Sequence, residues 1–501
     1  MSRFLSASTV RLVQKELLAE EVNDHEFLRC VRPYASKPLS AVLLSGGQPP
    51  VEGESRYSIA AWDPLLLFEA KGNRCFLRKP GNTVQVNANS LDVLDDVLGA
   101  LQPDFPLELP PFCGGALGYF AYELKNSIER LPQTARDDLN LPDILLLWPS
   151  RIMIHDRLSG KLHALALAMD GKEERGTAAG PFHSNTGFRT PSGPGPCEET
   201  GPGALRSNFS REAYIEAVRR VRHYIREGDA YQVNLSQRFE IPFAGDPFEL
   251  WASLFAVNPA AFYAFIHAGA HLVLSTSMER FLYRQGKKIE TRPIKGTRKR
   301  GATAQEDLAL KEDLRASPKD DAELSMIVDL LRNDLGRICA PRTIRVVEHK
   351  RIESYRNVHH LVSIVTGELR PEIGYGQILR AAFPGGSITG CPKIRAMEII
   401  DELEPNVRHV YTGSIGYLGW HENMDLNIAI RTALLHEAKC CVSVGGGIVF
   451  DSDEEDEYQE TLHKGRTLFE VINRMAGASH VARTDASTRA DSVAERQVRR
   501  T

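Results

Sequence analysis

One lysine in the sequence stands where it could become a nucleophile. Lys295 lies in the segment Thr291–Thr297, between Pro293, which fixes its own φ angle, and Gly296, which is free to adopt many. We therefore expect a defined turn where the chain leaves a strand. A lysine with the ordinary pKa of about 10.4 is almost fully protonated at pH 7, and burial or neighbouring cations are needed to free the amine. The basic residues that flank the segment could supply those cations; a solvated basic loop or a phosphate contact is the simpler alternative.

Three glutamates could supply hard oxygen ligands for a metal ion. Glu457 and Glu460 are three residues apart on the last predicted helix and share one face with Lys464, and Glu323 lies near the start of another predicted helix. Such oxygens suit Mg²⁺, which keeps several waters and accepts substrate oxygens in its remaining positions. The alternative is a solvated helix face in the acidic segment Asp451–Glu457.

Other polar side chains offer acid, base and anion-binding chemistry. Glu279 ends the link between two predicted strands and could act as a general acid if burial raises its pKa. His360 could act as an acid, a base or a hydrogen-bond donor, or could simply pack in its strand. Arg431 could hold a carboxylate with two nitrogens or form a surface ion pair. The loop Gly385–Gly390 precedes a helix that starts at a proline, so its amides and the Thr389 hydroxyl could bind an anion or cap an ordinary turn.

The predicted elements place these residues in an α+β protein. Strands in antiparallel-looking pairs, with helices inserted irregularly, favour large antiparallel sheets over a doubly wound parallel sheet. The expected helices cover residues 10–31, 91–101, 211–227, 247–258, 305–317, 320–335, 393–404 and 453–474. The expected strands cover residues 41–44, 56–61, 65–70, 112–120, 144–148, 151–156, 162–168, 229–239, 271–275, 280–283, 342–348, 358–367, 413–418, 427–435 and 442–449.

Composition divides the chain into four parts. Residues 1–170 are rich in predicted strands, and residues 208–475 carry nearly all the candidate chemistry. Between them, residues 171–207 are dominated by Gly, Pro, Ser, Thr and Glu and cannot bury a core, which predicts a mobile linker or long loop. Residues 476–501 are polar and are predicted to be disordered.

The overall balance is that of a soluble globular protein. Of 501 residues, 42% are hydrophobic and 25% charged, and the net charge of −4 does not indicate bulk nucleic-acid binding. The first ten residues lack a continuous apolar segment and no apolar run is long enough to span a bilayer, so we expect neither a signal peptide nor a membrane anchor. Eight cysteines without Cys-x-x-Cys spacing suggest reduced thiols in a cytoplasmic protein.

Eight motifs, taken together, resemble those of the chorismate-utilising enzymes. They are Gly114–Glu123, Gly228–Leu235, Ser277–Phe281, Pro293–Thr297, Ile327–Asp334, Val358–Leu361, Phe383–Lys393 and Glu457–Glu460. The similarity is dense between about residues 210 and 473 and thinner before 130, and motifs of this length and order are specific for the superfamily. The resemblance implies two antiparallel sheets packed as a sandwich, with helices outside and the active site between the sheets.

The resemblance also implies roles for the candidate residues. A chorismate dianion would be held on Mg²⁺ by Glu323, Glu457 and Glu460, and Glu279 would protonate the departing C4 hydroxyl. The positions that match the family's substrate pocket are His360, which is also a candidate catalytic residue, Thr389, Gly390, Tyr411, Arg431, Gly446 and Lys464.

Lys295 distinguishes branches of the family. The anthranilate, isochorismate and salicylate synthases usually carry alanine at this position, whereas the branch that forms aminodeoxychorismate carries lysine. In that branch the amine is thought to attack C2 as the C4 hydroxyl leaves, and ammonia then attacks C4 and expels the lysine, so that two allylic displacements replace one difficult step. The prediction is therefore a Mg²⁺-dependent enzyme of this branch, serving 4-aminobenzoate and folate synthesis. The alternatives are an anthranilate-forming enzyme, a relative from secondary metabolism, and a catalytically silent chorismate-binding partner of a glutaminase.

Two further expectations concern partners and regulation. No Cys-His-Glu glutaminase constellation is evident, so ammonia would come from solution or from a separate glutamine amidotransferase. The segments containing Ser45, Tyr57 and Ser58 resemble the part of the family that forms a tryptophan-sized pocket between the sheets, with ordinary core as the alternative. Met278 and Cys391 depart from the family pattern, which commonly has proline and alanine there, and Met278 could change how Glu279 is aimed.

Overall fold

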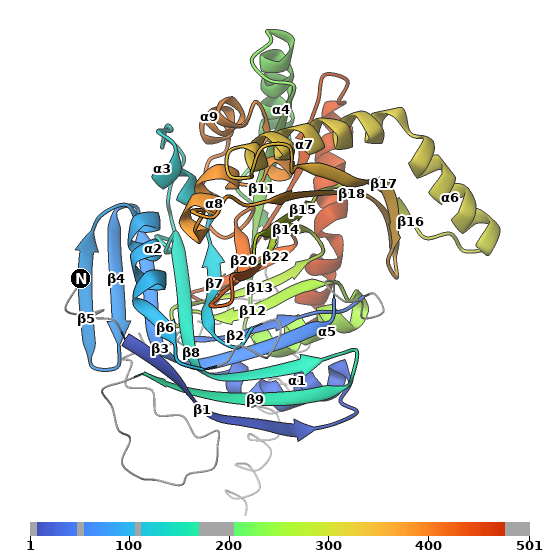
Figure 1. Cartoon of the computed structure of the whole chain (residues 1–501). Coiled ribbons are helices and arrows are strands. Elements are labelled where there is room, and N and C mark those ends of the chain that lie inside the picture. Colours follow the sequence, from blue (N-terminus) through green and yellow to red (C-terminus); the bar gives the residue numbers. More distant parts are fainter. Residues whose placement is uncertain (1–7, 48–54, 106–111, 170–204, 476–501) are drawn as a thin grey trace, which may run out of the picture.

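The computed structural model describes residues 8–47, 55–105, 112–169 and 205–475 (Figure 1). Most of the predicted linker and the predicted disordered tail lie outside these residues. The end of the predicted linker is described: Arg206–Ser207 form a two-residue strand, β10, paired with β11 (Gln232–Pro242).

The helices agree with most of the sequence predictions. They are α1 (Asp24–Ala35), α2 (Ser90–Ala100), α3 (Lys125–Ile128), α4 (Arg211–Arg226), α5 (Pro247–Val257), α6 (Ala304–Ala316), α7 (Pro318–Gly336), α8 (Tyr375–Ala382), α9 (Lys393–Leu403), the 3₁₀ turns η1 (Tyr122–Leu124) and η2 (Gly386–Ile388), and a C-terminal helix over residues 454–475. Local capping explains several starts, because the side chains of Ser210, Asp246 and Ser317 accept hydrogen bonds from the first turns of α4, α5 and α7.

The strands account for most of the remaining ordered chain. They are β1 (Ser8–Ala19), β2 (Ser40–Leu44), β3 (Tyr57–Lys71), β4 (Arg74–Lys79), β5 (Asn82–Asn87), β6 (Leu101–Pro103), β7 (Gly115–Phe120), β8 (Ile144–Asp156), β9 (Lys161–Met169), β12 (Phe262–His267), β13 (His271–Ser277), β14 (Arg280–Gln285), β15 (Lys288–Arg292), β16 (Ile294–Lys299), β17 (Arg345–Ser354), β18 (Val358–Glu368), β19 (Gly390–Cys391), β20 (Ser414–Gly419), β21 (Asn423–Asn427), β22 (Thr432–His436) and β23 (Lys439–Ile448).

The strands form two large antiparallel sheets joined by two long strands. The first sheet runs β1-β9-β8-β3-β2-β12-β13-β22-β23-β11, and the second runs β5-β4-β3-β8-β7-β20-β21-β14-β15-β18, with β16 and β17 on either side of β18. Among the described strands, only β1 and β6 pair in parallel. The predicted α+β class with large antiparallel sheets is thus confirmed.

The two long strands β3 and β8 were each predicted as two shorter ones, which is wrong. They pair with each other from Tyr57–Asp156 to Ala70–Ile144, with one irregularity near Pro64. The first half of β3 contacts β2 and its second half contacts β4, so each strand belongs to both sheets. Sequence pattern suggested a break because the polar Asp63 and Pro64 interrupt the apolar run, but pairing along the whole length keeps the strands continuous.

Apolar residues that alternate along the strands build three core layers. In β12, Ala264 and Ile266 lie in the cluster between the sheets, whereas Tyr263 and Phe265 face the opposite side. That outer side of the first sheet is covered by α1, α5 and the C-terminal helix, and the outer side of the second sheet is covered by α2, α7, α8 and α9 (Figure 1). Burial on both faces explains why many strands read as continuous apolar runs.

Two further predictions of elements are wrong. Residues 10–31 do not form one helix: β1 pairs with β9 as far as Ala19, and α1 starts only after Asn23, whose side chain closes a capping box with Glu26. Residues 427–435 are not one strand either, because the chain leaves β21 at Asn427 and joins β22 at Thr432. The pairing of β1 with β9 replaces the first part of the predicted helix. The predicted strand is interrupted at Arg431, whose φ angle is positive.

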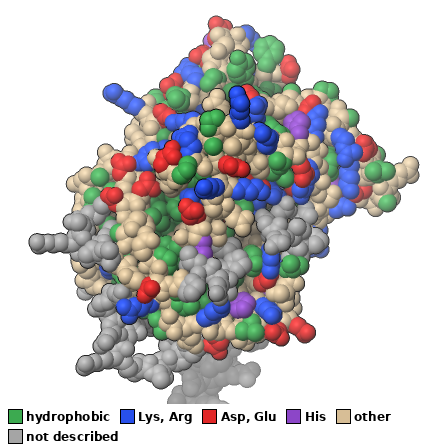
Figure 2. All heavy atoms as spheres, in the orientation of Figure 1, with side chains coloured by type: hydrophobic (Ala, Val, Ile, Leu, Met, Phe, Trp, Pro, Cys, Tyr) green, Lys and Arg blue, Asp and Glu red, His purple; other side chains and the backbone are tan. Residues whose placement is uncertain are grey.

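The surface carries charges of both signs. On the face shown in Figure 2, basic and acidic side chains are interspersed, in keeping with the small net charge. No helix in the described ranges combines the length and the apolarity needed to cross a membrane.

Candidate active site

Lys295 lies in a strand, β16, and not in the predicted turn. It pairs with Leu361 of β18, and Thr297 pairs with His360, so that Gly296 is the extra residue of a bulge. Gly296 has φ of +72°, and a Cβ atom there would lie 2.9 Å from Cγ of Asp320. The glycine is therefore required by its backbone conformation and by the close approach of α7, and the bulge directs Lys295 toward the site.

Burial makes the Lys295 amine easier to deprotonate. Removal of the amine from water lowers the pKa of Lys295, and the nearby cation Lys464 lowers it further. The carboxylates of Glu323 and Glu279 act in the opposite direction. The one hydrogen bond that its Nζ donates within the described chain goes to the carbonyl oxygen of Ser387, at 3.3 Å.

The flanking arginines do not supply the expected cations. Arg292 pairs with Glu290, Arg298 pairs with acidic residues of α6 and α7, and Arg300 pairs with Asp307. Their charges are already neutralised. Burial, which the sequence pattern could not measure, is therefore the main cause of the low pKa of the amine.

Glu279 has the protonation behaviour of a general acid. Its side chain is only 5% exposed, and burial raises the pKa of Glu279 to about 7, although the Ser387 hydroxyl and Lys295 oppose this. The Ser387 hydroxyl donates to Oε1 of Glu279 at 2.6 Å. The backbone is fixed as well, because the Glu279 amide donates to the Ser277 hydroxyl and its carbonyl accepts from the Ile428 amide. Met278 does not prevent this contact between the carboxyl group and the Ser387 loop.

Glu457 and Glu460 project from the C-terminal helix against β23. A Cβ atom at Gly446 would lie 3.0 Å from Oε2 of Glu457 and 3.1 Å from Oε1 of Glu460, so glycine leaves the space that both carboxylates occupy. Oε1 of Glu457 accepts a hydrogen bond from the Ser452 hydroxyl at 2.6 Å, while its Oε2 is buried with no partner among the described residues. A buried carboxylate oxygen without a donor suits a cation.

Electrostatics distinguish the three glutamates. Burial raises the pKa of both Glu323 and Glu457. Burial acts on Glu460 in the same direction, but the cation Lys464, which pairs with it, brings the pKa of Glu460 below its ordinary value. Lys464 also donates to the carbonyl oxygen of Gly445 at 3.0 Å, so its amine is fixed between helix and strand.

These carboxylates are compatible with Mg²⁺ in a site shared with substrate. In the described ranges no three His, Cys, Asp or Glu side chains already converge as a metal-ligand group. Mg²⁺ commonly takes only one or two carboxylates and completes its shell with water and substrate oxygens. The unpaired Oε2 of Glu457 and the raised pKa of Glu323 fit such a partial shell.

Arg431 is a half-buried cation suited to an anionic ligand. Its carbonyl oxygen accepts hydrogen bonds from the amide and hydroxyl of Thr276, which fixes a backbone with φ of +53°. Within the described chain no hydrogen bond or ion pair is made by its guanidinium. Burial lowers the pKa of Arg431, with Tyr411 and Glu460 acting in the opposite direction. The hydroxyl of Tyr411 stays protonated at neutral pH, because burial raises the pKa of Tyr411 to about 12.

His360 is uncharged at neutral pH. Burial and Arg431 lower the pKa of His360 to about 4, and its Nδ1 lies 3.0 Å from the Thr297 hydroxyl. Of the three roles considered from the sequence, a neutral hydrogen-bonding group agrees best with this environment.

The loop after Phe383 shapes the site mainly through its backbone. The Thr389 hydroxyl is fully buried and donates to the carbonyl oxygen of Gly385 at 3.0 Å, so it stabilises the loop itself. Gly390 has φ of +140°, and a Cβ atom there would lie 2.1 Å from the carbonyl oxygen of Gln232. The tight contact of this loop with β11 therefore requires glycine.

The structure gathers most of the predicted residues into one site at the junction of the two sheets. The second sheet contributes Lys295, Glu279 and His360, and strands of the first sheet lead to Arg431 and Gly446. Sequence reasoning missed Ser387, which touches both Glu279 and Lys295, although the motif that contains it was recognised. Nothing in the motif indicated which groups its hydroxyl and carbonyl would contact.

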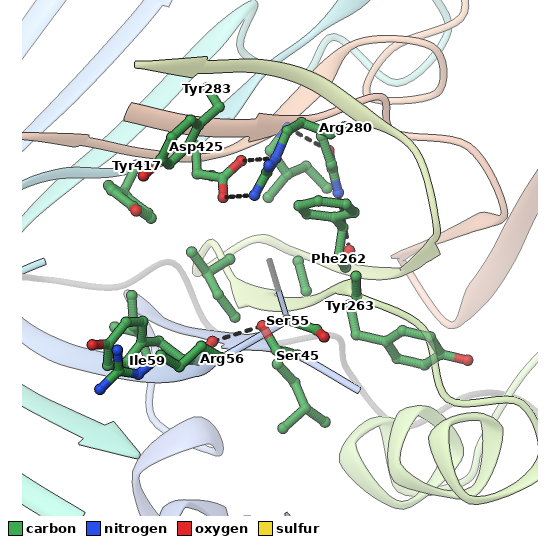
Figure 3. A pocket seen from close by; sticks show the side chains of 18 of the residues that line it. Ser45, Ser55, Arg56, Ile59, Phe262, Tyr263, Arg280, Tyr283, Tyr417 and Asp425 are labelled. Atoms are coloured by element: carbon green, nitrogen blue, oxygen red, sulfur yellow. Dashed lines mark hydrogen bonds and ion pairs between the residues drawn. The ribbon is translucent and has the colours of Figure 1, made fainter. Parts of the chain in front are cut away.

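The remaining predicted residues belong to a second pocket of about 490 Å³. Ser45, labelled in Figure 3, and Tyr57 line it. Ser58 is not a lining residue, but its hydroxyl accepts a hydrogen bond from the Ser45 amide. The opposite wall carries Arg280, whose guanidinium makes two hydrogen bonds to Asp425, at 3.0 and 2.9 Å. A cavity at these positions agrees with the predicted pocket better than with the alternative of ordinary core, and tryptophan as its ligand stays a prediction.

Comparisons with known proteins show the family of the chain. Residues 41–470 match the family model of the chorismate binding enzymes, and the chain belongs to that family. It is 41% identical to aminodeoxychorismate synthase component 1 of Klebsiella aerogenes, over 86% of this chain and 93% of that protein. It is 38% identical to anthranilate synthase component 1 of Thermus thermophilus, over 88% and 98% of the two chains.

Solved structures share the fold. Anthranilate synthase component I from Streptococcus pneumoniae superposes with a TM-score of 0.69 at 32% identity, covering 82% of this chain and 91% of that one. The menaquinone-specific isochorismate synthase MenF from Escherichia coli gives 0.67 at 18% identity, covering 94% and 97%, and supports the fold alone. The chain is thus a chorismate-converting enzyme whose relatives divide between two products.

Proposed function

We propose that this chain forms 4-amino-4-deoxychorismate from chorismate and ammonia through a covalent intermediate on Lys295. One observation carries the proposal: an enclosed lysine of lowered pKa and a glutamic acid with a pKa of about 7 both contact the same residue, Ser387. Overall identity does not distinguish the products, because relatives of both kinds are about equally similar.

In the proposed first step the neutral Lys295 amine attacks C2 of chorismate. The ring double bonds shift and the C4–O bond breaks, and Glu279 gives its proton to the departing hydroxyl, which leaves as water. Glu279 is then a carboxylate and the lysine nitrogen carries the positive charge. A pKa near neutrality lets Glu279 exist in both forms under working conditions.

In the second step ammonia attacks C4, the double bonds shift back and the C2–N bond breaks. Lys295 departs as an amine, and the proton released as ammonia becomes an amine substituent returns to Glu279. The hydroxyl has been replaced by an amino group, and both side chains are back in their starting states. In this proposal His360, neutral at pH 7, and the Arg431 cation would hydrogen-bond to the substrate and hold it.

We propose that Glu323, Glu457 and Glu460 hold Mg²⁺ together with water and a substrate carboxylate. The ion would neutralise the dianion and orient its ring. Ammonia would come from a separate glutamine amidotransferase, as the name "component 1" of the relatives suggests.

A product assay tests the function. The pure chain is incubated with chorismate, Mg²⁺ and ammonium at alkaline pH, and half of the sample receives aminodeoxychorismate lyase. We expect 4-aminobenzoate only in the half that contains lyase. Fluorescent anthranilate formed without lyase would instead support the anthranilate-forming alternative, to which the Thermus and Streptococcus relatives point. Intact chorismate in both halves, also after a glutamine amidotransferase and glutamine are added, would support the silent-partner alternative.

We also propose that the second pocket binds tryptophan or an amino acid of similar size. Its volume and its aromatic and ionic lining, which includes Phe262, Tyr57 and Arg280, support this. Calorimetry with tryptophan, together with analysis of what the protein releases on denaturation, tests it. No heat of binding and no released ligand would contradict the proposal.

A further inference from the structure

Ser387 connects the proposed acid to the proposed nucleophile. It lies in the 3₁₀ turn η2, Gly386–Ile388. Its hydroxyl donates to Oε1 of Glu279 at 2.6 Å, and its carbonyl oxygen accepts from Nζ of Lys295 at 3.3 Å. Glu279 precedes β14 and Lys295 lies in β16, so a single residue from a third element contacts both groups.

The backbone of Ser387 is itself held in place. The Asn234 side chain on β11 donates to the Ser387 carbonyl oxygen at 2.8 Å, and the Asn234 amide donates to the carbonyl oxygen of Thr389, also at 2.8 Å. The buried Arg408 donates to the carbonyl oxygen of Ile388 at 3.1 Å. Three hydrogen bonds therefore fix the direction in which the Ser387 carbonyl and hydroxyl point.

We propose that Ser387 is a positioning residue, which orients the Glu279 carboxyl group and the Lys295 amine toward the same substrate and stabilises the ionised form of Glu279. This inference rests on the proposed function in assigning Glu279 and Lys295 as acid and nucleophile. Its effect on Glu279 does not depend on the identity of the product.

The chemistry of the two contacts supports this role. The carbonyl oxygen can only accept, so it takes an N–H of the neutral amine and leaves the nitrogen lone pair free to point elsewhere. The hydroxyl can donate to the carboxylate that Glu279 becomes after it has protonated the leaving group. A hydrogen bond to a charged group in a buried place is among the stronger ones in proteins.

The effect of the Ser387 hydroxyl on the pKa of Glu279 can be separated from the effects of neighbouring groups. From β16, the Lys295 cation and a hydrogen bond from the Ile294 backbone also lower the pKa of the Glu279 carboxyl group. The adjacent Arg280 is committed to Asp425 and Glu290 on the side of the second pocket. Removing the hydroxyl should therefore raise the pKa of Glu279 by about one pH unit, the size expected for a hydrogen bond to an ionised group.

The test measures the titration of Glu279 directly in the full-length chain. The protein is labelled with carboxyl-¹³C glutamate, and the NMR resonance of Glu279 is identified by its loss in a Glu279→Gln variant. We expect its midpoint to lie about one unit higher in Ser387→Ala than in the unchanged protein. Ser387→Thr, which keeps the hydroxyl, should restore the lower midpoint. Because Ser387 is partly exposed, losing one oxygen should leave the fold intact.

A matched control separates this effect from the general loss of a serine hydroxyl. Ser414 is buried and its hydroxyl donates to the Asn427 carbonyl oxygen at 2.7 Å, which is a backbone acceptor and not a carboxylate. Ser414→Ala should leave the midpoint unchanged. An equal midpoint in Ser387→Ala and the unchanged protein would overturn the inference, as would an equal shift in Ser414→Ala.

Kinetics provide the second readout. If Glu279 acts as an acid, the alkaline limb of kcat/KM should move upward in Ser387→Ala by the same amount as the NMR midpoint, with kcat reduced more than KM is changed. A shifted midpoint in a chain that makes no aminodeoxychorismate would keep the effect on Glu279 and reject the proposed function. If the chain makes aminodeoxychorismate but the NMR midpoint of Glu279 is not shifted in Ser387→Ala, the inference alone is rejected.

Discussion

The candidate active site and the second pocket contain similar side chains that are used differently. Both contain arginine and glutamate in buried places. In the second pocket, Arg280 is 4% exposed and bonds to both Asp425 and Glu290. In the active site, the half-buried Arg431 guanidinium makes no hydrogen bond or ion pair among the described residues, and the buried Oε2 of Glu457 has no partner there.

The difference separates charges that are paired within the folded chain from charges that are available to bind a ligand. A buried ion costs several kcal/mol of desolvation free energy unless a partner compensates it. The Arg280 network compensates this cost internally, so the unbound protein is already stable there. At the active site the cost remains, and a substrate dianion and a metal ion are the groups whose charges would remove it. Perturbed ionisation without internal compensation is a frequent property of functional sites.

Replacing the nucleophile should have the largest effect. Lys295→Ala should lower aminodeoxychorismate formation by about 10³-fold or more, because the two-step route requires a covalent amine. Chorismate should still bind with an affinity within about tenfold, since Arg431 and the carboxylates remain. Lyase-coupled turnover and calorimetry measure the two quantities. Unchanged turnover would mean that Lys295 does not react.

Breaking the compensated network should cost stability. Arg280→Met leaves Asp425 without its cation and Glu290 with Arg292 as its main partner, so the free energy of unfolding should fall by about 3–5 kcal/mol. Urea denaturation measures this. A loss below about 1 kcal/mol would show that the second pocket is no better compensated than the active site.

The matching change at the active site should affect binding and not stability. Arg431→Met removes a half-buried cation without a close partner among the described residues, so the free energy of unfolding should change by less than about 1 kcal/mol or rise. KM for chorismate should increase about 10- to 100-fold, because a charged hydrogen-bonding partner of the dianion is lost. If Arg431→Met lost as much unfolding free energy as Arg280→Met, the proposed difference between the two regions would be contradicted.

The pH dependence of stability sharpens the contrast further. The folded-state pKa of Glu279, about 7, is higher than in the unfolded chain, so the folded protein binds the proton more tightly and loses stability as pH rises from about 4.5 to 7. Glu279→Gln removes this dependence. The variant should therefore gain stability relative to the parent across that window, by up to about 3 kcal/mol. Denaturation at pH 5 and pH 8 measures the difference, and a constant difference would contradict the raised pKa.

The smallest expected effect concerns the space around the metal carboxylates. Gly446→Ala would place a methyl group 3.0 and 3.1 Å from oxygens of Glu457 and Glu460. The side chains must shift by a few tenths of an ångström, so the Mg²⁺ concentration for half-maximal activity should rise about tenfold while thermal stability changes little. Gly419→Ala, whose nearest neighbour is a backbone oxygen at 3.2 Å outside the site, is the control.

The sequence by itself determined the family, most helices and the candidate reacting groups. Motifs around Lys295, Glu279 and Glu457 are local and carry their chemistry in residue type and spacing. Strands in antiparallel-looking pairs, with helices inserted irregularly, indicated large antiparallel sheets. A short-range pattern is enough for these conclusions because each depends on neighbours within one element.

Only the tertiary structure decided the environment of those groups. It joined β3 and β8 into strands shared by both sheets, made a strand of the region predicted as the first helix, and changed the turn at Lys295 into a bulge. It also paired the flanking arginines with other residues and brought Ser387 between Glu279 and Lys295. The physical reason is that burial depends on segments far apart in the chain, and burial is what shifts the pKa values on which the proposed chemistry depends.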